Sequence, residues 1–78
     1  MPDQMIPKSD VTLVMQNDVN ALAREIREAK GRIERNKNDA AIVAHNKELI
    51  DQKRRDIKCI IETASRLGIK LVDPGELK

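Results

Sequence analysis

The turn-forming sequence Asn36-Lys37-Asn38-Asp39 lies near the middle of the chain, between two long stretches with helical periodicity. Asn and Asp side chains can hydrogen-bond to their own backbone, which favours turns over helix interiors. Asn38 or Asp39 can also cap a following helix. These four residues therefore predict a break between two helices rather than one continuous helix.

The stretch before this turn predicts a first helix over about residues 9–36. Its apolar residues recur at intervals of four and three, which places them on one side of a helix, as in coiled coils. These residues are Met15, Val19, Leu22, Ile26, Ala29 and Ile33. Ser9 and Asp10 are candidate N-caps, because their oxygens can accept from the first free backbone N–H groups. Asn17-Asp18 is a second candidate start.

The stretch after the turn predicts a second helix over about residues 39–67. Continuing the first heptad phase would place Lys47 and Arg54 in the core, whereas a shifted phase gives a mostly apolar series. That series is Val43, Asn46, Ile50, Lys53, Ile57, Ile60, Ala64 and Leu67. No apolar residue occurs from Asp51 to Asp56, and we expect the stems of Lys53 and Arg54 to cover this gap while their charges reach water.

The second helix is expected to end in a Schellman motif at Leu67-Gly68-Ile69. Gly68 would adopt a left-handed conformation, and Ile69 would fold back onto the last turn. The chain is thus predicted as one small domain in three parts. These are a flexible N-terminal arm at residues 1–8, a helical hairpin at 9–68 and a short C-terminal tail at 69–78.

The charge distribution favours an antiparallel arrangement of the two helices. Residues 24–37 carry a net charge of +3 and residues 38–51 a net charge of −2. Folding at the turn sets these blocks side by side, whereas a parallel dimer of one long helix would stack like charges. The predicted fold class is all-α, an antiparallel two-helix hairpin resembling a coiled coil. Two long helices crossing antiparallel, as in a domain swap, would give the same pairing.

A lone hairpin would leave much of its apolar surface in water, although helices gain most of their stability from packing. We therefore expect a homodimer that forms a four-helix bundle. A helix of another protein would meet the same need.

The composition limits the classes of fold and location. The chain has 78 residues, 40% of them hydrophobic, and no Phe, Tyr or Trp. This composition suits a charged helical protein and argues against a β-sandwich or barrel. A single cysteine excludes an intramolecular disulfide, so we expect a reducing, cytoplasmic location. No apolar run is long enough to span a membrane.

His45 and Cys59 are the residues that could serve metal binding or nucleophilic chemistry. They lie fourteen residues apart, roughly 21 Å along a helix, too far to share one metal ion. We expect His45 to face solvent. Cys59 is either a small filler at a helix–helix contact, the interpretation that we favour, or an exposed thiol that could cross-link two chains on oxidation. The three glycines are scattered, so no phosphate-binding loop is present. We predict no cofactor, no metal, no small-molecule substrate and no enzymatic activity.

Asn46 in the second apolar series and Asn36 near the turn allow two interpretations. A buried Asn can fix the alignment of packed helices at some cost in stability. Alternatively, both residues are solvated.

The function we expect is a non-catalytic protein–protein interaction or assembly module, such as an adaptor, chaperone, scaffold or inhibitor. Apolar helix faces would supply the contact, and charged flanks would set its orientation. The predicted interface residues are Val19, Leu22, Ile26, Ile33, Val43, Ile50, Ile57 and Ile60.

The alternative is a small helical dimer that binds RNA or DNA through a basic strip on the second helix. Acidic neighbours and the absence of stacking aromatic residues weigh against it. The strip comprises Lys47, Lys53, Arg54, Arg55 and Lys58. A third hypothesis makes residues 69–72 the docking segment, with the hairpin as a spacer.

Overall fold

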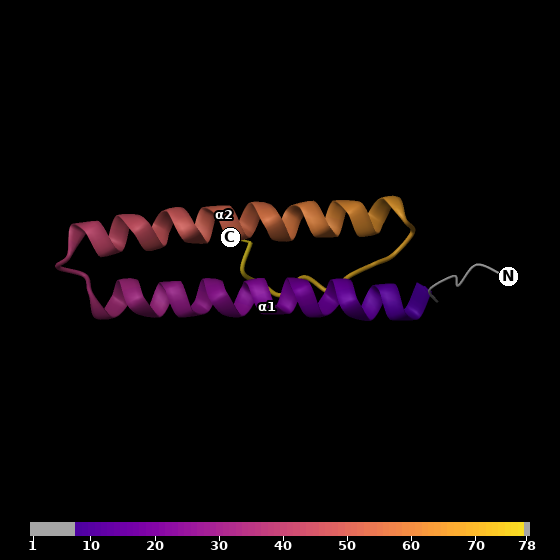
Figure 1. Ribbon diagram of the computed structural model, residues 1–78, viewed down its shortest axis with the longest axis horizontal. Helices are drawn as coiled ribbons and strands as arrows, with labels where there is room; N and C mark the ends of the chain where they lie inside the picture. Colours follow the sequence, from indigo (N-terminus) through magenta and orange to yellow (C-terminus); the bar gives the residue numbers. More distant parts are fainter. Residues whose placement is uncertain (1–7, 78) are drawn as a thin grey trace, which may run out of the picture.

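The fold of the protein is that of a computed structural model, in which residues 8–77 are described. Helix α1 spans Lys8–Arg35 and helix α2 spans Ala40–Arg66. The two helices pack side by side in antiparallel orientation, and the residues after α2 return across them (Figure 1). The all-α, antiparallel hairpin is thus confirmed. Apart from Lys8, the arm expected at residues 1–8 lies outside the described residues.

Helix α1 begins earlier than the sequence predicts. Ser9 and Asp10 lie inside the helix, which starts at Lys8, so neither is its N-cap. Asn17-Asp18 likewise lies within α1. Asp10 instead occupies the first turn of the helix, where a carboxylate interacts favourably with the positive end of the helix dipole.

Asp39 caps helix α2, as predicted. Its backbone is extended, with φ −102° and ψ 100°. Its Oδ1 accepts hydrogen bonds from the backbone N–H groups of Ala41 at 3.1 Å and Ile42 at 3.2 Å. The Asp39 N–H in turn donates to the carbonyl of Asn36 at 2.9 Å, which closes the turn.

The seam between the helices forms the core. Val19, Ile26 and Ile57 are the largest fully buried side chains. Ala23, which the heptad stripe omits, is also completely buried. Leu67, which the second series includes, is 56% exposed because it is the C-cap of α2 and lies beyond its last turn.

The chain leaves α2 through the predicted Schellman motif. Gly68 has φ +75°, a conformation that an L side chain rarely adopts. The Gly68 N–H donates to the carbonyl of Ser65 at 3.0 Å, and the Ile69 N–H donates to that of Ala64 at 2.8 Å. Ile69 is only 6% exposed, so the fold-back adds a large apolar side chain to the interior.

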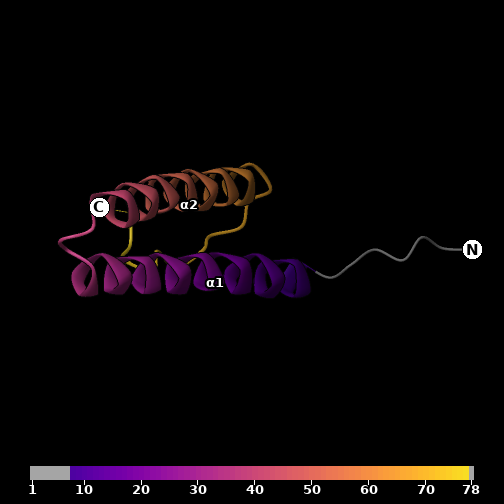
Figure 2. The ribbon, with the colours of Figure 1, turned by 60° about the vertical axis from the view of Figure 1, so that its left-hand side comes forward.

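The tail, residues 69–77, forms a third layer on the hairpin. It crosses from the end of α2 to α1 and then turns back toward α2 (Figures 1 and 2). Leu71 and Leu77 pack against the core. The side chain of Gln16 pairs with the backbone of Val72, donating to its carbonyl at 3.0 Å and accepting from its N–H at 2.8 Å.

Charged groups hold the far end of the tail. The Glu76 carboxylate pairs with Lys30 at 2.8 Å and with Arg27 at 3.4 Å. The Nε of Arg54 donates to the Glu76 carbonyl at 2.9 Å. The tail is therefore bonded to both helices.

Between residues 8 and 77, neither helix is long and apolar enough to cross a membrane.

Candidate interaction surface

The tail makes the two broad faces of the hairpin different. We call the side over which it lies, marked by Gln16, Arg27, Lys30 and Arg54, the covered face. The opposite side is the open face. An α-helix turns about 100° per residue, so Gln16 and Arg27 lie on one side of buried Ile26 while Asp18 and Glu25 lie on the other. The open face is thus a separate surface that the tail does not reach.

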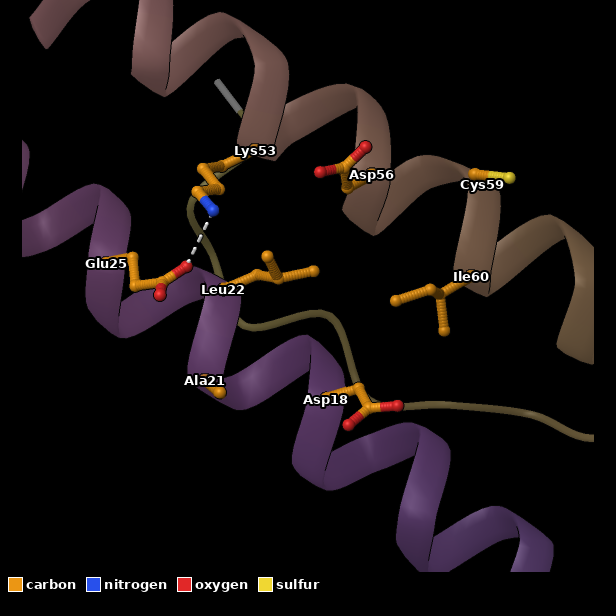
Figure 3. A pocket seen from close by; sticks show the side chains of 8 residues that line it. All are labelled: Asp18, Ala21, Leu22, Glu25, Lys53, Asp56, Cys59 and Ile60. Carbon is orange, nitrogen blue, oxygen red and sulfur yellow. Dashed lines mark ion pairs between the residues drawn. The ribbon is translucent and has the colours of Figure 1, made fainter.

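A shallow groove of about 580 Å³ runs between the helices on the open face. Leu22 of α1 and Ile60 of α2 point toward each other across it (Figure 3). Both side chains are half-buried. The groove is lined by Asp18, Ala21, Leu22 and Glu25 of α1 and by Lys53, Asp56, Cys59 and Ile60 of α2. It offers apolar contact in its centre and charge along its edges.

Carboxylates dominate the charge of this groove. Glu25 Oε2 lies 3.1 Å from Lys53 Nζ, an ion pair that bridges the helices (Figure 3). Asp18 and Asp56 form no ion pair with any residue of the described range. Three carboxylates therefore face one lysine, which favours a cationic group on any molecule that binds there.

The bridging ion pair differs from what the block charges predict. Glu25 belongs to the basic block 24–37, and Lys53 lies outside the acidic block 38–51. The antiparallel orientation is confirmed, but direct pairing between the two blocks does not produce this contact.

The predicted protein-interface residues divide into two groups. Val19, Ile26, Ile50 and Ile57 are buried inside the hairpin, where they pack against one another. The other four are half-buried: Leu22, Ile33, Val43 and Ile60. Of these, Leu22 and Ile60 meet in the groove.

The predicted nucleic-acid residues do not form one strip. Lys53 is turned to the open face by Glu25. Arg54 reaches to the covered face and contacts the tail. Their side chains are 25% and 24% exposed, so both are largely buried at the apolar gap. The charge of Arg54 ends on the tail, however, and not in water as expected. Lys47, Arg55 and Lys58 remain exposed on α2.

Asn46 is buried, at 3% exposure, and is therefore the buried polar residue of the first interpretation, not a solvated one. Its Oδ1 accepts from Arg32 Nε at 2.9 Å, and its Nδ2 donates to the Ile42 carbonyl at 2.8 Å. The amide thus links α1 to α2 at one fixed position. Asn36 is half-buried, and its side chain donates to the Arg32 carbonyl at 2.8 Å.

His45 is exposed, as predicted, and Cys59 follows the second of its two interpretations, the exposed thiol, rather than the favoured filler. Cys59 is exposed at the rim of the groove. It follows buried Ile57 by two residues, about 200° around the helix, and so points away from the seam. No group of three potential metal ligands occurs within residues 8–77.

No protein-family model, curated protein or solved structure matches this chain.

Proposed function

We propose that this protein is a non-catalytic interaction or assembly module that binds another polypeptide through its open face. The observation that carries this proposal is the contrast between the faces. The tail fills one side of the hairpin, whereas Leu22 and Ile60 on the other side line an unfilled groove. Half-buried apolar side chains surrounded by charge are typical of surfaces that recognise a helix.

An amphipathic helix suits the shape and charge of this groove. A groove between two helices accepts side chains spaced three or four residues apart on a third helix. Asp18, Glu25 and Asp56 would favour Lys or Arg on the flank of that helix. The same charges would disfavour an acidic partner, which gives the surface a basis for selectivity.

The nucleic-acid alternative has less support. Three of its five residues remain exposed, but Lys53 and Arg54 are drawn to opposite faces. Phosphate binding depends on several cations acting together, and Asp51 lies 4.0 Å from Arg54. Docking by residues 69–72 also has less support. Of the apolar residues in this segment, Ile69 and Leu71 pack inward, and only Val72 is largely exposed, at 72%.

The proposal is tested by comparing two sets of substitutions. Leu22→Gln with Ile60→Gln removes the apolar contact from the open face, and Ala44→Gln makes a matched change at an exposed site on α2. Each protein, attached to a resin, is exposed to an extract of its source cells. Retained polypeptides, including further copies of the chain, and 260 nm absorbance are measured. Circular dichroism confirms that each variant is helical.

We expect the open-face variant to bind its polypeptide partner at least tenfold more weakly, since each tenfold corresponds to about 1.4 kcal/mol. The Ala44→Gln control should bind like the wild type. One result would overturn the proposal: the protein retains nucleic acid, and this retention depends on the basic residues and not on the groove. Retention would then survive Leu22→Gln with Ile60→Gln. It would be lost in a variant that combines Lys47→Gln, Arg55→Gln and Lys58→Gln.

A further inference from the structure

Three charged residues follow one edge of α1 along the open face. Asp18, Glu25 and Arg32 are spaced seven residues apart, which places them on one line of the helix. Asp18 and Glu25 line the groove. Arg32 continues the line toward the turn, so the edge is acidic at one end and basic at the other.

The two ends of this line lack a partner of opposite charge among the residues that the structure describes. Arg32 is half-buried, and its Nε is bonded to the neutral Asn46 side chain. Between residues 8 and 77, no carboxylate forms an ion pair with Arg32, and no cationic side chain forms an ion pair with Asp18. Glu25, midway between them, is already paired with Lys53.

We infer that a second copy of this chain covers the open face, antiparallel to the first, with Asp18 of each copy against Arg32 of the other. This inference rests on the proposed function and names the partner. The two hairpins would lie face to face with their turns at opposite ends. The result is a four-helix bundle in which α1 lies on α1 and α2 lies on α2.

A two-fold axis passing near Glu25 produces this pairing. Asp18 and Arg32 are each seven residues from Glu25, so the rotation that reverses α1 exchanges their positions. One contact surface therefore makes two Asp18–Arg32 ion pairs, as an isologous interface requires. The two Glu25 side chains meet near the axis, each beside the Lys53 of its own chain.

The same rotation covers the apolar side chains of the groove. Leu22 lies three residues before Glu25 and Ile60 lies seven residues after Lys53, so both fall within the overlap of the two copies. Both side chains are half-buried in the free chain, and the second copy would remove them further from water.

The opposite orientation, with both turns at one end, leaves the two unpaired charges without a partner. In it, α1 of one copy lies over α2 of the other. Arg32 is level with Asn46 and Glu25 is level with Lys53, so Arg32 of each copy would lie over the neutral Asn46 of the other, and Asp18 would lie near Ile60. Neither Asp18 nor Arg32 gains a contact of opposite charge, which favours the antiparallel arrangement.

The surface is large enough for a stable dimer. The overlap around Glu25 extends for roughly 34 Å of helix at about 1.5 Å per residue, and two packed helices are about 20 Å wide. This gives roughly 700 Å² per copy, close to the ~800 Å² per partner of a standard protein interface.

Complementary charge reversals test the pairing. Asp18→Lys makes both ends of the line basic, and Arg32→Glu makes both acidic. We expect each variant alone to self-associate at least tenfold more weakly than wild type, and an equimolar mixture to recover the wild-type dimer by light scattering. Arg24→Glu, an equal charge change at an exposed site, should have little effect. Asp18 and Arg32 lie roughly 21 Å apart within one chain, so only contact between chains can produce the rescue.

Cross-linking gives a second measurement that leaves both residues intact. Glu25→Cys in a Cys59→Ser background places a thiol near the axis. Wild-type Cys59 is the control, because it lies six residues beyond Lys53, which puts its two copies roughly 18 Å apart. A short bismaleimide should therefore link Glu25→Cys chains efficiently and wild-type chains poorly.

Failure of this inference differs from failure of the proposed function. A mixture that stays monomeric, or cross-linking through Cys59 instead of Glu25→Cys, would overturn the antiparallel pairing. Wild-type chains that remain monomeric at millimolar concentration would exclude a second copy as the occupant. The open face would still be a binding surface if Leu22→Gln with Ile60→Gln then abolished capture of a different polypeptide.

Discussion

Leu22 and Ala23 are neighbours on α1 but belong to different faces of the hairpin. Ala23 lies toward the covered face and is completely buried, whereas Leu22 lies toward the open face and is half-buried. The larger apolar side chain is thus the more exposed one. The apolar spacing within each helix therefore does not by itself set how far each side chain is buried.

The two faces also differ in how their charged side chains are paired. On the covered face, the Glu76 side chain is 14% exposed and pairs with two cations, Arg27 and Lys30. On the open face, the Glu25 side chain is 50% exposed and pairs with Lys53 alone. Ion pairs on the covered face complete an intramolecular contact, whereas Asp18 and Asp56 on the open face form no ion pair within residues 8–77.

The largest effect on stability should come from removing the buried apolar side chain at the start of the tail. Ile69→Ala is expected to lower the free energy of unfolding by about 2–4 kcal/mol, because it empties a buried site. Leu67→Ala, two residues earlier and 56% exposed, should cost well under half as much. Urea denaturation monitored by circular dichroism measures both. Equal losses would show that the tail does not stabilise the covered face.

A smaller effect is expected at Asn46, which joins the helices beneath the open face. Asn46→Ala removes both hydrogen bonds of the buried amide and should cost about 1–2 kcal/mol. The exposed Asn17→Ala is the control and should be neutral or slightly stabilising, since Ala favours helix. Thermal melts of the two variants measure the difference. A stable Asn46→Ala protein would mean that the link from Arg32 contributes nothing to packing.

The smallest effect concerns the charge that fastens the end of the tail. The hydrogen bond from Lys30, together with the charges of Lys30 and Arg27, lowers the pKa of Glu76 below its ordinary value of 4.5. A lowered pKa stabilises the fold above the unfolded pKa, and this contribution disappears as pH falls through the folded pKa. Glu76→Gln should therefore cost less than about 1 kcal/mol near neutral pH.

The difference between wild type and Glu76→Gln should shrink as the pH falls below about 4.5. Chemical denaturation at a series of pH values measures it. Glu62→Gln, an exposed glutamate on α2, serves as the matched control. A difference from wild type that stays constant with pH would show that the Glu76 carboxylate does not act through its charge.

Local patterns in the sequence predict the hairpin well. The turn capped by Asp39, the seam through Ile26 and Ile57, and the Schellman ending at Gly68 each depend on residues a few positions apart. Such signals are strong because capping and heptad spacing have direct physical causes.

The third layer could not be predicted in the same way. The apolar residues Ile69, Leu71 and Leu77 hint that the tail packs somewhere, but its contacts join distant segments. Gln16 meets Val72 across 56 positions of sequence, and no local rule specifies that choice. The hydrogen bond from Arg54 to the tail belongs to the same layer and could not be predicted either.

The fold-back of the tail also limits how far an assembly can grow. A hairpin with an unoccupied apolar surface on both faces could associate without limit, because every added molecule would present a second free surface to the next. Such open-ended stacking builds fibres. Here the segment after Gly68 occupies one side of the hairpin within the same chain. An assembly formed through the open face, as proposed, would therefore close once that face is covered, because the tail already occupies the other face.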